Sequence, residues 1–209
     1  MNATIPPSLS PLRRSDLHPD PIVQFSEWFR AAENTGLPFP NAMTLATANR
    51  HGIPSARMVL LKGFDARGFR FFTNFESQKA HELAENPFAA LVFYWQPLNR
   101  QVRIWGMASK IPADESDDYF RTRPRDNQIS AWASEQSRRI ENRAVLESRF
   151  EHFARKFGKR PVPRPPHWGG YVLKPSEFEF WQGQPNRLHD RFRYSPLTDG
   201  TWHIERLAP

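Results

Sequence analysis

Five short runs rich in β-branched and aromatic residues, between positions 42 and 111, most constrain how this chain can fold. Turn-forming sequences separate several of them, among them Asn49–Gly52 and Asp65–Gly68. Many short strands at such spacing, joined by tight turns, are typical of a barrel or a sandwich. The predicted strands are Ala42–Ala48, Ser55–Lys62, Gly68–Asn74, Phe88–Trp95 and Gln101–Ile111.

Helices are predicted around these strands. Asp20 followed by Pro21 is typical of a helix start, which predicts a helix to about Glu33. A second helix is expected over Glu76–Glu85, between two strands. The segment Pro112–Phe157 is also predicted to be helical. Its apolar stripe would face the core or a subunit interface and consists of Leu146, Phe150, Phe153 and Phe157.

The rest of the chain completes a single domain. Residues 1–19 are rich in proline and polar side chains, so we expect a mobile N-terminal arm followed by one domain over residues 20–209. Arg160–Pro166 is predicted to be a stiff connector because its prolines exclude helix. Two further strand segments would close the sheet: Tyr171–Trp181, and Arg191–Leu207 with a turn at Leu197–Gly200. The predicted fold is α+β and predominantly antiparallel β, a barrel with peripheral helices.

The composition excludes several classes of protein. The chain has no cysteine, which rules out disulfide scaffolds, zinc–thiolate sites and thiol nucleophiles. Its seven histidines are never three or four residues apart, so we expect no metal site. The longest apolar run, Ala89–Trp95, is too short to span a membrane, and residues 1–14 lack the apolar core of a secretory signal, so a cytoplasmic protein is expected. Glycine-rich nucleotide loops and the Gly-x-Ser-x-Gly elbow are missing from the sequence, so catalysis would depend on a cofactor.

The basic charge allows anionic partners. Lys and Arg total 29 against 22 Asp and Glu, a net charge of +7, and 23 of the 29 are Arg. Arg binds phosphate or carboxylate through two parallel hydrogen bonds, although Arg-biased codon use would give the same composition. A nucleic-acid-binding module is one alternative. The Arg residues, however, are spread among strand ends and short clusters without a continuous basic stripe, so no nucleic-acid partner is expected.

Four segments combine basic and polar residues beside predicted strands. Arg57–Lys62 has cations at both ends of an apolar centre, although an ordinary strand with solvated ends has the same pattern. Phe72–Lys79 crosses a strand-to-helix junction, where a hydroxyl, an amide and a Lys suit a phosphate or simply cap the helix. Tyr119–Gln128 holds three Arg within five residues and suits a phosphate monoester or a solvated surface. Phe180–Arg191 is dense in Trp, Arg and His, which favours a binding or catalytic site.

Taken together and in order, these segments resemble the pyridoxine/pyridoxamine 5′-phosphate oxidase family. The resemblance runs from about Asp20 to Pro209 without a large gap. No single motif is specific for this family, but eight motifs in the same order along the chain are. They are Arg57–Lys62, Ser77–Lys79, Arg100–Val102, Arg123–Asp126, Gln136–Ser137, Phe180–Gly183, Arg187–Arg191 and Arg206–Pro209.

The resemblance implies an FMN-binding split β-barrel and a homodimer that holds FMN between its subunits. It also implies oxidation of pyridoxine 5′-phosphate and pyridoxamine 5′-phosphate to pyridoxal 5′-phosphate by O2, with hydrogen peroxide, and ammonia from the amine, as by-products. The implied FMN contacts are Arg57, Met58, Val59, Leu60, Leu61, Lys62, Phe72, Thr73, Gln78, Lys79, Gln101, Gln136, Ser137, Trp181 and Arg191. The implied substrate contacts are Lys62, Tyr119, Arg123, Asn127, Arg187, Leu188 and His189, with Arg187 and His189 as the catalytic pair that orients and polarises the reacting substituent.

Two positions depart from the family pattern. Gln78 stands where members usually carry Arg, which removes a positive charge near the cofactor phosphate, and Asn127 stands where Ser is usual. The N-terminal substrate-contacting stretch of some members has no good match, although Arg13–Arg14 would serve as a lid. The nearest alternative within this fold is a related oxidase of phenazine biosynthesis. Gln78 favours it slightly, whereas Lys62 and Arg123–Asp126 favour the vitamin B6 enzyme.

Overall fold

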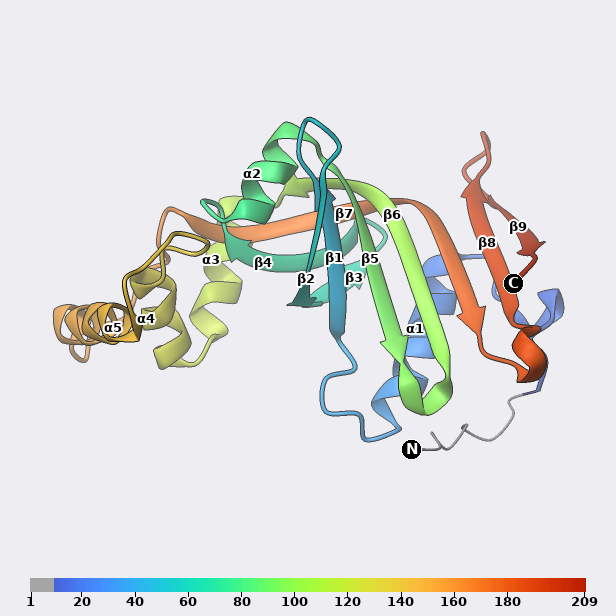
Figure 1. Ribbon diagram of the computed structural model, residues 1–209, viewed down its shortest axis with the longest axis horizontal. Coiled ribbons are helices and arrows are strands. Elements are labelled where there is room, and N and C mark those ends of the chain that lie inside the picture. Colours follow the sequence, from blue (N-terminus) through green and yellow to red (C-terminus); the bar gives the residue numbers. More distant parts are fainter. Residues whose placement is uncertain (1–9) are drawn as a thin grey trace.

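The computed structural model describes residues 10–209, and within them nine strands form one antiparallel sheet (Figure 1). The strands are β1 (Ala42–Ala48), β2 (Pro54–Leu60), β3 (Gly63–Asp65), β4 (Gly68–Asn74), β5 (Phe88–Trp95), β6 (Arg100–Lys110), β7 (Trp168–Gln182), β8 (Asp190–Pro196) and β9 (Trp202–Leu207). The helices are α1 (Pro21–Glu33), α2 (Gln78–Glu85), α3 (Ala113–Thr122), α4 (Arg125–Ala133) and α5 (Arg143–Phe157). The order along the sheet is β2-β1-β5-β6-β7-β4-β3, and β8 with β9 branches from β7.

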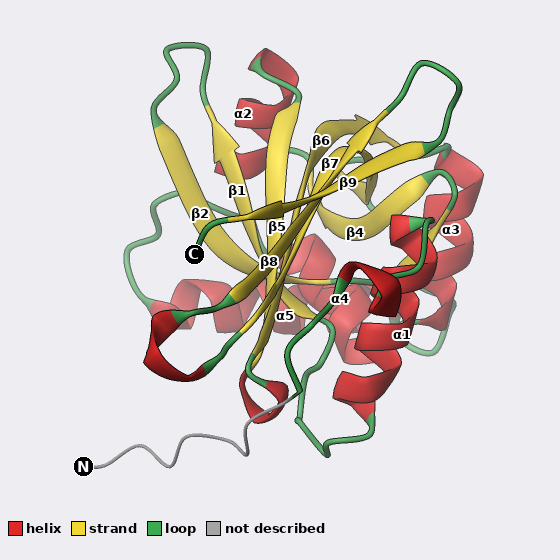
Figure 2. Cartoon of the chain, turned by 90° about the vertical axis from the view of Figure 1, so that its right-hand side faces the viewer, coloured by secondary structure: helices red, strands yellow, loops and turns green. Residues whose placement is uncertain are grey.

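The long strand β7 organises the sheet. One of its edges pairs with β6 along its length, while the other pairs first with β4 and then, from Phe178, with β8. A register shift at Trp105–Gly106 marks a bulge, where a strand bends and its twist increases. The first part of β7 pairs with β4 and the last part pairs with β8, and the sheet curls into an open half-barrel with helices around it (Figures 1 and 2). The predicted fold class, antiparallel β with peripheral helices, is confirmed.

Aromatic side chains fill the inside of the curled sheet. The ring of Phe25, on α1, lies 4.9 Å from that of Phe64 and 5.0 Å from that of Phe93. Asp20 fixes the start of this helix, because its carboxylate accepts a hydrogen bond from the backbone N–H of Ile22 at 2.8 Å. The helix predicted at this position is confirmed, and it closes one side of the core.

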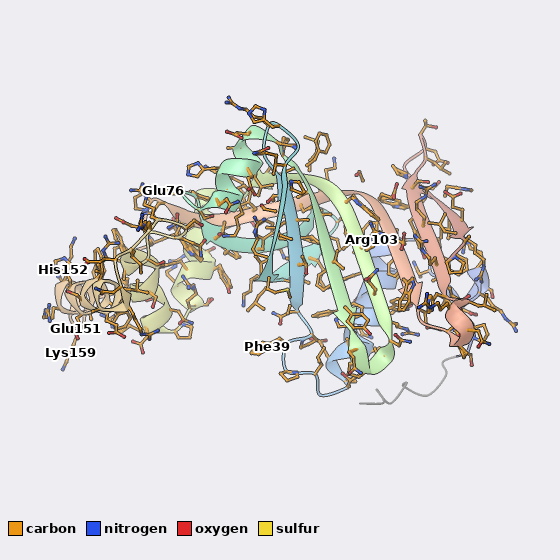
Figure 3. All side chains as sticks on the ribbon, viewed as in Figure 1. Phe39, Glu76, Arg103, Glu151, His152 and Lys159 are labelled. Atoms are coloured by element: carbon orange, nitrogen blue, oxygen red, sulfur yellow. The ribbon has the colours of Figure 1, made fainter. Side chains whose placement is uncertain are left out.

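The helices α3, α4 and α5 form a lobe that projects from the sheet, at the left of Figure 1. Two residues of the apolar stripe predicted on α5, Phe153 and Phe157, pack on Trp132 of α4. The ring centroid of each lies 5.6 Å from that of Trp132. His152 lies at the outer edge of the lobe (Figure 3). Residues 134–142 are not helical, so the prediction of helix over the whole segment is wrong there. Of the helices in the described residues, none is long and apolar enough to cross a membrane.

Residues 10–19 are packed against the sheet, which corrects the mobile arm predicted over residues 1–19. Both leucines of this segment are buried in the main core. The backbone N–H of Leu12 donates to Oδ2 of Asp190 at 2.8 Å, and its carbonyl accepts from Nη2 of Arg206 at 2.6 Å. A proline-rich, polar composition predicts disorder where little apolar surface can be buried, and here the two leucines overcome that tendency. The first nine residues of the predicted arm lie outside the described part of the chain.

Gly68, at the start of β4, permits a close approach to β7. Its φ is +128°, and a Cβ atom there would lie 2.1 Å from the carbonyl oxygen of Leu173. We expect Gly68→Ala to lower the free energy of unfolding by on the order of 3 kcal/mol, because it strains the backbone and also pushes two strands apart. Urea unfolding followed by circular dichroism measures the loss.

Gly200→Ala is the matched control for this substitution. Its φ is +84°, but nothing lies within 4 Å of an added Cβ, so only backbone strain on the order of 1 kcal/mol is expected. Equal losses in the two variants would show that the close approach at Gly68 contributes nothing.

Candidate active site

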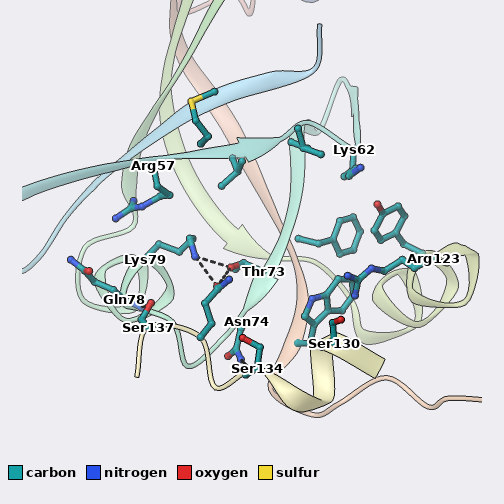
Figure 4. A pocket seen from close by; sticks show the side chains of 18 of the residues that line it. Arg57, Lys62, Thr73, Asn74, Gln78, Lys79, Arg123, Ser130, Ser134 and Ser137 are labelled. Atoms are coloured by element: carbon teal, nitrogen blue, oxygen red, sulfur yellow. Dashed lines mark hydrogen bonds between the residues drawn. The ribbon is translucent and has the colours of Figure 1, made fainter. Parts of the chain in front are cut away.

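A cavity of about 660 Å³ opens between the sheet and the helical lobe (Figure 4). Its volume lies within the range of cofactor and small-molecule sites. Strands β2 and β4 supply one wall, α2 and the segment after α4 supply another, and α3 with the start of β7 closes the far end. It is lined by Ser55, Ala56, Arg57, Met58, Val59, Leu60, Lys62, Phe72, Thr73, Asn74, Gln78, Lys79, Tyr119, Arg123, Ser130, Ala131, Ser134, Gln136, Ser137 and Trp168.

Lys79, in the first turn of α2, forms the basic end of this cavity. Its buried Nζ donates to Oε1 of Gln136 at 2.8 Å and to Oγ1 of Thr73 at 3.1 Å (Figure 4). It also donates to Oγ of Ser77 at 3.3 Å. Within residues 10–209 these acceptors are all neutral, so the ammonium has no directly bonded carboxylate. Burial, together with the charge of Arg57, lowers the pKa of Lys79 to about 8. A bound phosphate would supply the missing negative charge.

Glu82 lies one helical turn after Gln78 and neutralises Arg57 beside the basic end. Its Oε2 is 3.2 Å from Nη2 of Arg57. The same oxygen accepts hydrogen bonds from Thr47 at 2.5 Å and Ser55 at 2.6 Å, and Oε1 accepts from Nε2 of Gln78 at 2.8 Å. Burial acts to raise the pKa of this carboxyl, but the hydrogen bonds it accepts outweigh burial and lower its pKa to about 2. Glu82 is therefore ionised at neutral pH.

Arg123, between α3 and α4, lies at the opposite end of the cavity against aromatic side chains. Its guanidinium carbon is 4.6 Å from the ring centroid of Trp168. Beside it, the rings of Phe72 and Tyr119 stack with their centroids 4.0 Å apart. Nζ of Lys62 lies 6.0 Å from the centroid of the Tyr119 ring. Burial lowers the pKa of Arg123, and its Nη1 is buried without a hydrogen-bond partner among residues 10–209. A buried, unpartnered guanidinium nitrogen is costly, so an anionic ligand would be stabilising here.

A second cluster of predicted site residues lies where β7 ends and β8 begins. The rings of Trp181 and His189 are 4.7 Å apart, and Nδ1 of His189 accepts from the backbone N–H of Gln184 at 3.0 Å. That bond leaves the proton of a neutral imidazole on Nε2. Arg187 and Leu188 are exposed, and Arg187 has a φ of +60°, a strained conformation of the kind found in functional loops.

Arg191 belongs to the same cluster and is held on both sides. Its Nη2 donates to Oε2 of the buried Glu179 at 2.8 Å, and its Nη1 donates to the carbonyl oxygen of Ala208 at 2.8 Å. The hydrogen bond with Glu179 raises the pKa of Arg191. In the sheet register, Gln101 and Arg191 lie on either side of Trp181, so the three side chains share one face.

The cavity therefore brings together most, but not all, of the predicted site residues. Those that line it are Arg57, Met58, Val59, Leu60, Lys62, Phe72, Thr73, Gln78, Lys79, Tyr119, Arg123, Gln136 and Ser137. The second cluster holds Gln101, Trp181, Arg187, Leu188, His189 and Arg191. Trp168 lines the cavity, whereas Trp181 lies thirteen residues later in β7, about 40 Å further as measured along the strand. Leu61 is buried in the core and Asn127 is exposed on α4, and neither lines the cavity.

Several residues at this site are missed by sequence reasoning. Glu82 could have been found from the sequence. It lies four residues after Gln78 on a predicted helix, so the two side chains must lie on the same face of that helix. Trp168 follows the proline-rich connector, and Ser130 and Ser134 belong to a helix end; no local pattern predicts their place in the cavity. In the described part of the chain, no three His, Asp or Glu side chains gather as a potential metal site.

Comparison with solved structures defines the class of the fold. PhzG from Burkholderia lata 383, solved in complex with tetrahydrophenazine-1-carboxylic acid, is 31% identical with a TM-score of 0.90 over 97% of this chain and 100% of that one. A pyridoxamine 5′-phosphate oxidase-related, FMN binding protein from Nostoc punctiforme is 19% identical and shares the fold, with a TM-score of 0.72 over 92% of this chain and 100% of that one. The half-barrel with its peripheral helices thus defines a protein of the split-barrel class.

The chain belongs to the pyridoxine/pyridoxamine 5′-phosphate oxidase family. Residues 29–156 match the family model described as pyridoxamine 5′-phosphate oxidase, and residues 168–209 match the pyridoxine 5′-phosphate oxidase C-terminal dimerisation region. The protein named pyridoxine/pyridoxamine 5′-phosphate oxidase in Cupriavidus metallidurans is 56% identical to this chain, over 96% of this chain and 94% of the relative. The protein of the same name in Nostoc punctiforme is 55% identical, over 97% of this chain and 94% of the relative. The predicted family is confirmed, and the phenazine-type protein is less similar in sequence. The dimerisation region indicates a homodimer.

Proposed function

We propose that this protein oxidises pyridoxine 5′-phosphate and pyridoxamine 5′-phosphate to pyridoxal 5′-phosphate, with FMN as cofactor and O2 as electron acceptor. The observation that carries the proposal is one cavity with a cationic group at each end. Lys79 forms one end, and Arg123, whose buried Nη1 has no partner in the described residues, forms the other. Two phosphate-bearing molecules, a flavin mononucleotide and a vitamin B6 phosphate, suit two such ends.

The side chains of the cavity fit FMN. Lys79 and Ser137 would bind its phosphate at the basic end. The β2 segment from Met58 to Leu60 would lie along the flat ring, since its exposed apolar side chains and backbone groups face the opening. When bound, FMN would supply the two-electron acceptor that takes a hydride from the substrate and passes both electrons to O2, which becomes hydrogen peroxide.

Arg123, Lys62 and Tyr119 would anchor the substrate phosphate at the other end. The Arg fork binds two phosphate oxygens at once, and the ammonium of Lys62 adds a second positive charge. Asn127 remains a predicted contact, since it lies four residues after Arg123 on the first turn of α4. Anchoring the phosphate holds the substrate ring in one place, which lowers the entropic cost of reaching the reactive geometry.

The second cluster would complete the cavity from the partner subunit. Arg187 and His189 lie within residues 168–209, which match a dimerisation region, and in a twofold-symmetric dimer the same face of each chain meets its copy. In the proposed dimer each cavity would receive Arg187 and His189 of the partner subunit. Met58, Leu60 and Tyr94 support this arrangement, because they leave large apolar side chains exposed around the cavity and the neighbouring strands. Arg187 and His189 would then orient and polarise the substituent that is oxidised.

Anaerobic mixing of the FMN-loaded protein with pyridoxine 5′-phosphate tests the proposal. We expect the flavin absorbance to bleach, and to recover when air is admitted, with pyridoxal 5′-phosphate as product. If FMN binds but neither vitamin B6 phosphate bleaches it, the substrate assignment is wrong and a phenazine-type oxidase takes its place. A protein that binds no FMN would overturn the cofactor assignment.

The affinity for FMN is expected to fall as the pH rises through about 8. Lys79, flanked by Arg57 and Glu82, pairs with the phosphate dianion only when protonated. Because its pKa in the flavin-free protein is about 8, binding above that pH requires uptake of a proton, so Kd rises about tenfold per pH unit. Fluorescence titration between about pH 6.5 and 9.5 measures this slope. Riboflavin, which has no phosphate, is the control, and an equal fall for both flavins would contradict the role of Lys79.

A further inference from the structure

We propose that Glu82 weakens phosphate binding at the basic end of the cavity, by neutralising Arg57 and by holding the side chain of Gln78. This inference rests on the proposed function in one respect, that the phosphate is the one carried by FMN. It makes Glu82 a residue that sets how strongly the protein prefers FMN to riboflavin.

The carboxylate of Glu82 is enclosed by donors. Only 7% of the residue is exposed, and its two oxygens accept hydrogen bonds from four side chains on β1, β2 and α2. These bonds lower its pKa to about 2, so the carboxylate is ionised at neutral pH. Its negative charge is therefore a fixed part of the basic end.

The guanidinium of Arg57 is directed at this carboxylate and its neighbours. Nη1 donates to the carbonyl oxygen of Leu45 at 3.3 Å and to Oγ1 of Thr47 at 2.5 Å. Nη2 donates to Oγ of Ser55 at 2.5 Å and to Oε2 of Glu82 at 3.2 Å. All four Nη protons are thus used within the protein, although Arg57 lines the cavity.

Gln78 is held in the same way. Its Nε2 donates to Oε1 of Glu82 at 2.8 Å, while its backbone N–H donates to Oγ of Ser137 at 3.2 Å. A phosphate at the basic end then meets Lys79 as the principal cation that has no carboxylate partner in the described residues, and Glu82 cancels the charge of Arg57 nearby. The basic end carries one net positive charge where Arg57 and Lys79 alone would give two.

The structure of this network predicts the effect of removing the charge of Glu82. Glu82→Gln has the same shape and can still accept from Thr47 or Ser55, but it leaves Arg57 uncompensated. A unit charge several ångströms from a phosphate in a partly buried site changes affinity by roughly tenfold. If Glu82 instead mainly orients Arg57 toward the phosphate, Glu82→Gln will weaken FMN binding.

The test measures Kd for FMN and for riboflavin by flavin fluorescence, using the full-length dimer freed of flavin. For Glu82→Gln we expect FMN to bind about tenfold more tightly, while riboflavin stays within about twofold of the wild type. Glu85→Gln is the matched control, because Glu85 lies on the same helix but is exposed and contacts the backbone of Arg50. It should change neither constant. Weaker FMN binding by Glu82→Gln, or an equal change for both flavins, would overturn the inference.

Gln78→Arg provides a second variant should Glu82→Gln fail to fold. The new guanidinium would pair with the adjacent Glu82, so the gain in FMN affinity should stay below about threefold. Where Glu82→Gln does fold, the same substitution in that background should add about tenfold, since no carboxylate would then capture the new cation. A full tenfold gain from Gln78→Arg alone would overturn the inference. Failure of the wild type to bind FMN would instead overturn the proposed function.

Discussion

Arg123→Ala is expected to raise KM for pyridoxine 5′-phosphate by about a hundredfold and to leave the bound FMN content unchanged. The size of the effect follows from the buried guanidinium, whose Nη1 has no partner within residues 10–209 and is free to bind an anion. Charge-assisted, bidentate hydrogen bonds to a phosphate are among the strongest that a side chain makes. Steady-state kinetics and the flavin absorbance of the purified variant measure the two quantities separately.

Two further variants separate charge from packing. Arg123→Met keeps an unbranched side chain against Trp168 but removes the charge, so it should raise KM as much as Ala does. Arg121→Ala removes an Arg that is exposed and pairs with Asp118 on the surface, and KM should not change. Loss of FMN from Arg123→Ala, with normal KM, would move Arg123 to the cofactor end of the cavity.

Mixed dimers of Arg123→Ala and Arg187→Ala should regain activity that neither variant has alone. Each variant is expected to be nearly inactive, the first because it binds substrate weakly and the second because reduction of the flavin slows. In a mixed dimer one cavity carries both substitutions and the other carries none. Random pairing makes about half of the dimers mixed, so about a quarter of wild-type activity should return. Coexpression of the two chains with different affinity tags provides the mixed dimers for assay.

The control for this experiment is Arg123→Ala paired with itself under both tags, which should stay inactive. If Arg187 acted in the cavity of its own chain, every cavity of the mixed dimer would carry one substitution and no activity would return. That result would contradict a cavity completed by the partner subunit.

Local sequence patterns predict the regular elements of this fold well. The strands Ala42–Ala48 and Phe88–Trp95 and the helix ending at Glu33 have the expected bounds, because alternation, β-branched content and a capped helix start are local signals. Strand β3, over Gly63–Asp65, was not predicted, since three residues are too few to show a period. Strand β7 begins at Trp168, before its predicted start, because its first residues include two glycines whose strand conformation depends on pairing with β4.

The site could be predicted only in part from the sequence. The residues of the β4–α2 junction lie close together in the chain, so a cavity beside Thr73 and Lys79 follows from local order. The separation of Arg187 from this cavity depends on the length and curvature of β7, which is a tertiary property. The packing of residues 10–19 is likewise tertiary, because its partners lie near the other end of the chain.

The contacts of Leu12 also determine when the second cluster can form. Leu12 lies 178 positions before Asp190 and 194 before Arg206, so these hydrogen bonds close almost the entire chain into one loop. Contacts of such long sequence separation form late in folding, because the entropy of loop closure must be overcome first. During synthesis the partners of Leu12 emerge last, after strands β1 to β6 are complete. We therefore expect the loop that bears Arg187 and His189 to be anchored late in folding, and a chain that stopped before Arg206 would keep only the hydrogen bond of Leu12 to Asp190.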